Sequence, residues 1–134
     1  MPNKSTIRKA KDDLREGKKP TTAAGEFVRE EIEHVRHGKH GARSPQQAIA
    51  IGLNEARRAG IPLKPPRRGR TSPKTRKSAA RAYQKGKSGA KKPNRKRSRA
   101  RERALKREPR NTTSRKALSR HGRSAARRRR ASRR

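Results

Sequence analysis

The sequence has no cysteine and no tryptophan, and it has one phenylalanine and one tyrosine among its 134 residues. The absence of cysteine excludes disulfide scaffolds, thiolate zinc sites and thiol catalysis. No apolar run approaches the roughly 18–20 residues that a membrane-spanning helix needs, and no apolar segment typical of a secretory signal follows Met1. We therefore expect a cytoplasmic protein without disulfides and without a membrane partner.

Acidic residues are scarce as well. Ten Asp and Glu face 44 Lys and Arg, which gives a formal net charge of +34 at pH 7. Hydrophobic residues make up 25% of the chain, whereas an ordinary globular domain has roughly 45–50%. Low hydrophobicity combined with high net charge is typical of intrinsic disorder. The composition thus predicts a polycation whose partner is a polyanion, and it excludes a core that spans the whole chain.

The charge is concentrated after Pro66. Residues 1–66 carry 14 Lys and Arg against 8 acids, a net charge of +6, whereas residues 67–134 carry 30 Lys and Arg against 2 acids, a net charge of +28. The apolar residues of this second half are mostly alanines. Because so few acids can pair with so many cations, we predict that the second half is an extended, disordered tail.

One stretch of the first half carries consistent helix signals. Ser44 is a good N-cap, Pro45 suits the first helical position, and Gln47 stands where a capping box has Glu or Gln. Gly60 suits the position that follows the end of a helix. Between them, one face repeats apolar residues at i, i+4 and i+7, namely Ile49, Leu53 and Ala56. These signals predict a helix that begins after Ser44 and ends before Gly60.

A preceding helix is predicted over residues 23–37. Its apolar face has the same spacing and consists of Val28, Ile32 and Val35. Because the connector to the next helix is short and contains glycine, we expect a helical hairpin over residues 23–61. The small residues Ala48 and Gly52 would let the two helices approach closely.

The expected architecture is a mostly disordered chain with a small all-α hairpin in its N-terminal half. Residues 1–22 are a basic segment with a short helix near residues 6–15, residues 23–61 are the hairpin module, and residues 62–134 are the disordered tail. Domains of fewer than roughly 40 residues usually need additional stabilisation. Two alternatives therefore stay open, a hairpin that self-associates as a homodimer and a loose monomeric hairpin.

Two segments resemble a known family. Residues 31–39 read EIEHVRHGK, and residues 44–60 read SPQQAIAIGLNEARRAG. Together they resemble a small bacterial domain of unknown function whose members pair a short helix end with a helix of the QAIAIGL type. Val35 stands where an aromatic residue is common in that family. The resemblance implies a bacterial source and a small helical module attached to a basic tail, with no activity to carry over. The tail is similar in composition to histone-like nucleoid proteins.

The tail is suited to neutralising phosphate charge. Each contact of Lys or Arg with a phosphate releases condensed counterions, and such contacts carry no sequence information. We therefore predict a nucleoid-associated, histone-like protein that binds DNA without sequence specificity and condenses it. The expected nucleic-acid-binding residues are Arg67, Arg68, Arg70, Lys74, Arg76, Lys77, Arg95, Lys96, Arg97, Arg127, Arg128, Arg129 and Arg130.

Two short motifs of the tail are typical of groove binding. Residues 67–71 contain Arg-Gly-Arg, the core of an AT-hook, whose flat backbone lets both arginines enter a narrow A·T-rich minor groove. Thr71 replaces the usual proline of that motif. Residues 72–76 are similar to the Ser-Pro-Lys repeats of linker-histone tails. Because both motifs arise readily in so basic a sequence, a minor-groove preference and a plain solvated basic linker stay open as alternatives.

Three parts of the tail consist largely of Ala, Arg and Lys, which are good helix formers. These parts are residues 77–85, 97–107 and 114–134. We expect charge repulsion to keep them unfolded in water, and contact with phosphate to let them order partly as helices.

The scarcity of aromatic residues favours duplex DNA over RNA. Proteins that read single strands stack bases on aromatic side chains. Phe27 is expected in the hairpin core, which leaves Tyr83 alone for such a role. An RNA- or ribosome-associated basic protein is the alternative function. A third interpretation has the acidic face of residues 23–37 dock another protein while the tail tethers it to nucleic acid.

No motif for catalysis or for phosphate-loop binding is present. His34, His37 and His40 recur at three-residue spacing beside glutamates, which is the kind of pattern a metal site uses. The same pattern is typical of a polar, solvated helix end, and no cysteine supports a metal site. We therefore expect no enzyme activity, no cofactor, no metal site and no small-molecule substrate.

Overall fold

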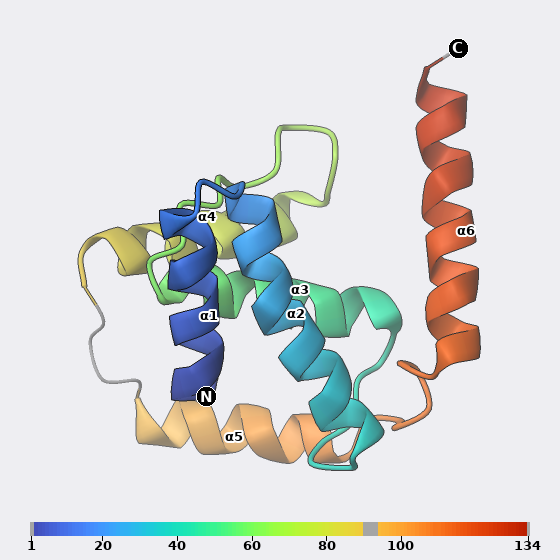
Figure 1. Ribbon diagram of the computed structural model, residues 1–134. Helices are drawn as coiled ribbons and strands as arrows, with labels where there is room; N and C mark the ends of the chain where they lie inside the picture. The colour runs from blue at the N-terminus through green and yellow to red at the C-terminus, as the bar shows by residue number, and fades with distance from the viewer. Residues whose placement is uncertain (1, 90–93, 134) are drawn as a thin grey trace. The chain divides into compact units, whose positions relative to one another are not determined.

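The computed structural model describes residues 2–89 and 94–133, and in these residues the chain forms six α-helices (Figure 1). Their bounds are Lys4–Arg15 for α1, Pro20–Arg36 for α2, Pro45–Arg58 for α3, Pro73–Lys87 for α4, Arg95–Lys106 for α5 and Arg115–Ser132 for α6. The last three helices lie in the part of the chain that was expected to be a disordered tail. The prediction of a mostly disordered chain is therefore wrong.

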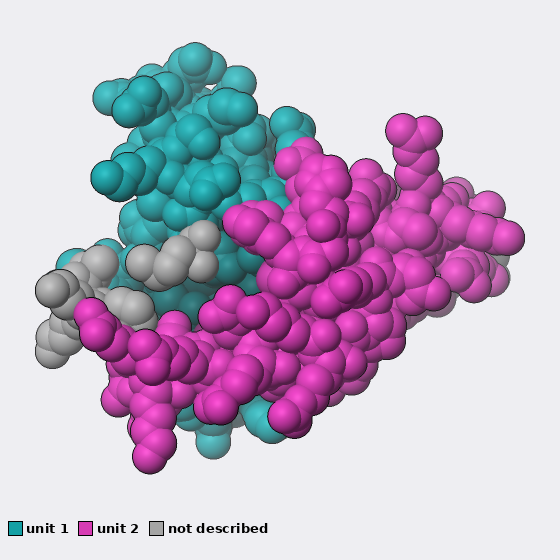
Figure 2. Space-filling view, turned by 90° about the horizontal axis from the view of Figure 1, so that it is seen from below, with its two compact units in different colours: residues 1–31, 50–93 teal, residues 32–49, 94–134 magenta. Residues whose placement is uncertain are grey.

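The chain divides into two compact units, which Figure 2 distinguishes by colour. Unit 1 consists of residues 1–31 and 50–93, and unit 2 consists of residues 32–49 and 94–134. The division falls inside α2 and α3. Each unit thus combines a segment that precedes Pro66 with a segment that follows it.

Alanine dominates the core of unit 1. Its fully buried cluster contains one aromatic residue, Phe27, and one larger aliphatic residue, Ile61; the other members are Ala10, Ala23, Ala24 and Ala56. Partly buried aliphatic side chains pack around this cluster, namely Ile7, Leu14, Leu53, Ala59 and Leu63. Small side chains let helix backbones approach closely, so a low hydrophobic content is compatible with close packing.

Two glycines show how closely these helices pack. A Cβ atom placed on Gly52 of α3 would lie 2.7 Å from Cα of Val28 on α2. The predicted close approach at Gly52 is therefore confirmed. In α4, a Cβ atom on Gly86 would clash with the backbone carbonyl of Arg57. Ala79 and Ala82 of α4 are each 2% exposed, so α4 packs into unit 1 with its small side chains.

The ends of α3 agree with the sequence signals. Ser44 Oγ accepts the N–H of Gln47 at 3.2 Å, and Gln47 Oε1 accepts the N–H of Arg43 at 2.6 Å. At the other end, Gly60 has φ +96°, and its N–H donates to the carbonyl of Arg57 at 3.1 Å while that of Ile61 donates to the carbonyl of Ala56 at 3.1 Å. This pair of bonds is the Schellman arrangement. The predicted helices before α3 are confirmed as well, as α1 and α2.

Unit 2 is held together largely by hydrogen bonds to the backbone. Its apolar cluster is small and consists of Val35, Ala42 and Ala48. The end of α5 and the turn after it dock on the end of α2 and the turn after it through four hydrogen bonds of 2.8 Å. The N–H groups of Gly41 and Ala42 donate to the carbonyls of Leu105 and Pro109. Thr112 Oγ1 donates to the carbonyl of Ala42, and Arg36 Nε donates to the carbonyl of Thr113. Thr113 itself is fully buried.

The tail prediction failed for a physical reason. Each tail helix has a polar N-cap whose side chain accepts backbone N–H groups, Ser72 for α4, Asn94 for α5 and Ser114 for α6. Most Lys and Arg side chains of these helices are exposed, where water and salt screen their repulsion. The positions of the three helix-forming parts agree with α4, α5 and α6, but the expectation that they are unfolded without phosphate is wrong.

None of the helices within the described residues is long and apolar enough to cross a membrane.

Candidate nucleic-acid interface

The Arg-Gly-Arg segment forms a tight turn in unit 1. Gly69 has φ +84°, the N–H of Arg70 donates to the carbonyl of Arg67 at 3.2 Å, and Arg68 pairs with Thr71 in an isolated bridge. The three arginines of this turn are exposed. The flat backbone that an AT-hook needs is thus not the conformation of this segment, and binding in a minor groove would require the turn to open.

The predicted residues of α4 form part of a longer stripe of cations. Lys74 and Lys77 are exposed, and Arg76 is partly buried. At 100° per residue, Arg81 and Lys85 fall on the same face as Lys74 and Lys77, and both are exposed. The prediction missed these two residues, although their spacing of seven and eleven from Lys74 would have identified them.

The predicted cluster on α5 is split between two faces. Arg95 and Lys96 lie with other exposed side chains along a hollow of about 570 Å³, which is also lined by Arg99, Glu102, Arg103 and Lys106. Arg97 is not among these lining residues. Lys106 Nζ lies 3.6 Å from Glu102 Oε1, so one carboxylate reduces the positive charge along this hollow.

The four consecutive arginines of α6 do not share a face. Arg127 and Arg130 lie on one stripe with three further exposed cations at helical spacing, Lys116, Arg120 and Arg123. Arg128 and Arg129 lie to either side of the partly buried Leu118 and Ala125. From Lys116 to Arg130 the stripe is roughly 21 Å long, and it contains no acidic residue. It is the longest uninterrupted row of exposed cations on a described helix.

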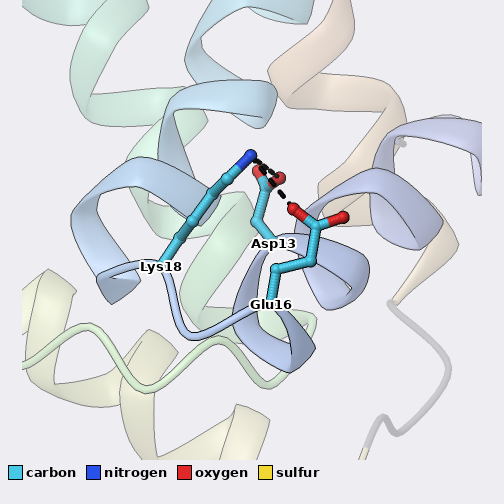
Figure 3. A network of polar contacts seen from close by, with 3 residues as sticks. All are labelled: Asp13, Glu16 and Lys18. Carbon is cyan, nitrogen blue, oxygen red and sulfur yellow. Dashed lines mark hydrogen bonds and ion pairs between the residues drawn. The ribbon is translucent and has the colours of Figure 1, made fainter.

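Two cations near the N-terminus of the chain, Arg15 and Lys18, differ from those of the α6 stripe because they have carboxylate partners. Lys18 Nζ lies 3.3 Å from Asp13 Oδ1 and 3.2 Å from Glu16 Oε2 (Figure 3). Hydrogen bonds to Asp13 and Glu16 raise the pKa of Lys18. Arg15 likewise contacts Asp12. Because carboxylates already offset their charge, we expect Arg15 and Lys18 to contribute less to phosphate binding than the cations of α6.

The aromatic side chains are not available for stacking. Phe27 is fully buried. Tyr83 is partly buried, and Lys87 Nζ lies over its ring, 4.6 Å from the centroid. No base-stacking platform of the kind that single-strand readers use is therefore present among the described residues.

A different set of polar side chains lies where α2 ends. Glu31, His34 and His40 each have one metal-binding atom within 4.8 Å of the others. The rings of His34 and His40 meet edge to face, with centroids 5.9 Å apart. His37, which shares the three-residue spacing of the histidines, is exposed and does not belong to this group.

Comparisons of the chain with protein-family models, with curated proteins and with solved structures find no match. The resemblance to a small bacterial domain therefore stays a prediction, and the function is argued from the chain's own residues.

Proposed function

We propose that this protein binds nucleic acid through exposed rows of Lys and Arg on α4, α5 and α6, with duplex DNA preferred over RNA and no dependence on base sequence. By neutralising phosphates it would also help to condense DNA, as nucleoid-associated proteins do. The single observation that carries the proposal is the acid-free stripe of α6, formed by Lys116, Arg120, Arg123, Arg127 and Arg130.

The stripe suits a phosphate backbone because its charges follow one another closely along the helix. The Arg and Lys side chains of the stripe have no carboxylate partner among residues 2–89 and 94–133. Duplex DNA carries one negative charge per roughly 1.7 Å of its axis, so a row of about 21 Å meets more phosphates than it has cations. Each contact releases counterions, which is the main source of affinity in sequence-independent binding.

The preference for duplex DNA follows from what the surface lacks. Recognition of single-stranded RNA depends on aromatic platforms. Of the two aromatic side chains, Phe27 is fully buried and the ring of Tyr83 is covered by Lys87. Helices that are already formed also lose less conformational entropy on binding than a disordered tail would. These observations support a folded protein that binds duplex DNA without dependence on base sequence.

The experiment compares two variants of equal charge. One variant carries R120Q, R123Q, R127Q and R130Q on the α6 stripe. The control carries K4Q, R8Q, K9Q and K11Q on α1, which are also exposed. Fluorescence anisotropy with a mixed-sequence duplex at several salt concentrations gives the slope of log affinity against log salt. Each lost phosphate contact reduces this slope by about 0.9, so we expect a reduction of about 3 to 4 for the stripe variant and a smaller one for the control.

Equal slopes for the two variants would contradict the proposed interface, because net charge alone would then account for binding. Competition at matched salt between duplex DNA and double-stranded or ribosomal RNA tests the preferred partner. If RNA displaces DNA as well as unlabelled DNA does, the proposed preference is wrong and the alternative of an RNA-binding protein is favoured.

A further inference from the structure

Three metal-binding side chains meet within ten consecutive residues of the chain. Glu31 and His34 lie one turn apart on α2, a spacing that puts two side chains on one helix face. His40 returns to this face because the chain reverses at Gly38, which has φ +77°. In that reversal, the N–H of Gly38 donates to the carbonyl of Val35 at 3.2 Å and that of Lys39 to the carbonyl of His34 at 2.9 Å. One helical turn and one tight turn thus fix the three positions.

A hydrogen bond to the backbone orients the ring of His40. Its Nδ1 lies 2.9 Å from the carbonyl oxygen of Gly41. A carbonyl oxygen can only accept, so Nδ1 carries the hydrogen of this bond, and in the neutral ring the lone pair is then on Nε2. The N–H of Gly41 in turn donates to the carbonyl of Leu105 at 2.8 Å. A backbone carbonyl that holds one ring nitrogen, leaving the other for a metal, is the usual support of a histidine ligand.

The three side chains are sheltered from solvent to different degrees. Glu31 is 3% exposed, and His34 and His40 are partly buried. A cation bound by them would therefore be partly removed from water, and the negative charge of Glu31 would offset part of the loss of hydration. Two imidazole nitrogens and one carboxylate oxygen are ligands that Zn²⁺ and neighbouring transition metals bind well.

We propose that Glu31, His34 and His40 form a binding site for one divalent transition-metal ion, with Zn²⁺ as the ion that fits the ligand set best. Three protein ligands leave the fourth position of a tetrahedral site to water. The site is independent of the proposed nucleic-acid interface. It would fasten the end of α2 to the turn at residues 37–43, on which the segment after α5 docks, so the expected role of the ion is to stabilise the end of α2 and this turn.

The test uses the full chain, freed of metal by a chelator and studied without nucleic acid. Calorimetric titration with Zn²⁺ is expected to give one ion per chain for the unmodified protein. The variants H34A, H40A and E31Q are each expected to lose at least tenfold in affinity. H37A is the matched control because His37 lies in the same turn, is exposed and has no place in the site; it is expected to bind as the unmodified protein does.

Two further measurements distinguish the loss of a specific metal site from the loss of folded structure and from adventitious binding to histidine. Circular dichroism before addition of metal identifies any variant that fails to fold, and E31Q, which changes one ligand oxygen to an amide, keeps the size of the side chain. Bound Co²⁺ should show the visible absorption of tetrahedral coordination in the unmodified protein and in H37A, and not in H34A. An affinity loss in H37A equal to that in H34A, or no stoichiometric binding by the unmodified protein, overturns the proposal. Neither result bears on the salt-dependence experiment.

Discussion

Glu55 of α3 and Glu31 of α2 share a hydrogen bond inside unit 1, and burial together with the charge of Glu31 raises the pKa of Glu55 to about 8. Burial is the larger cause, because a carboxylate loses its hydration there and the neutral acid does not. One of the few acids of this basic protein is thus protonated in the folded state over a range of pH where it is ionised in the unfolded chain.

This shift makes the free energy of unfolding depend on pH with a definite sign. Between the unfolded value of 4.5 and about 8 the folded state holds a proton that the unfolded state has released, so the stabilising contribution is complete below about pH 4.5 and is lost as the pH rises through 8. E55Q cannot ionise, so its free energy of unfolding should not fall with pH in this way. We expect the difference in stability between E55Q and the unmodified protein to grow, in favour of E55Q, by at least ~1.4 kcal/mol from pH 5 to pH 9, the equivalent of one pKa unit.

Urea denaturation at several pH values, with a chelator present, measures this gain. E26Q is a suitable control because it removes one carboxylate from α2 and leaves Glu31 and Glu55 unchanged. An advantage of E55Q that stays constant from pH 5 to pH 9 would mean that Glu55 ionises normally in the folded protein.

A second prediction concerns the contact between α2 and α3. G52A should destabilise the protein by ~1–3 kcal/mol, the usual cost of overpacking, because its Cβ atom would lie 2.7 Å from Val28 Cα. G25A on α2 is the control, since its Cβ atom would meet nothing within 4 Å, and Ala is favoured over Gly in a helix by up to ~1 kcal/mol. Thermal denaturation should therefore show opposite shifts, and equal shifts would contradict the close packing at Gly52.

A third prediction tests whether the tail is part of the folded structure. G86A of α4 would clash with the backbone carbonyl of Arg57, whereas G122A of α6 has open space around its Cβ atom. If α4 packs against α3, G86A lowers the melting temperature of the chain and G122A does not. In a disordered tail both substitutions would be neutral or would slightly increase helix content. Differential scanning calorimetry distinguishes the two outcomes.

A fourth prediction concerns Thr113, which is fully buried although it is polar. Its Oγ1 donates to the carbonyl of Ile32 at 3.4 Å, and its own carbonyl accepts from Arg36 Nε at 2.8 Å. T113V keeps the shape and removes only the weaker, longer bond, so we expect a loss below ~1.5 kcal/mol. R36M removes the donor to the Thr113 carbonyl and should cost more. Urea denaturation of both variants tests this order, and the reverse order would mean that the Arg36 bond contributes little.

Local signals made the first half of the fold predictable from sequence. Ser44, Gln47 and Gly60 act on backbone groups three or four residues away, so their roles at the ends of α3 can be predicted from spacing alone. The helical spans of the tail were predictable for the same reason, because Ala, Arg and Lys favour helices wherever they stand.

The packing of the tail was not predictable because it depends on contacts between residues far apart in sequence that leave no apolar periodicity. Gly86 fits against the backbone of Arg57, and Gly41 donates to the carbonyl of Leu105. These contacts depend on backbone atoms and on glycines, which have no side chain. The expectation of disorder was based on the content of hydrophobic side chains and on the net charge. The cluster at the end of α2 was missed for a related reason. Spacing grouped His37 with His34 and His40, whereas the helix places Glu31 one turn from His34 and the reversal at Gly38 brings His40, not His37, to these two residues.

The most direct test of the account is the helix content of the intact chain with and without duplex DNA, measured by circular dichroism at a salt concentration where anisotropy shows that the duplex is bound. If α4, α5 and α6 are already folded and hold their cations in rows, the protein's helical signal is nearly the same in both states. A large gain of helix on binding, from a free protein with only the helices of residues 1–66, would contradict the account and restore a disordered tail that folds on phosphate.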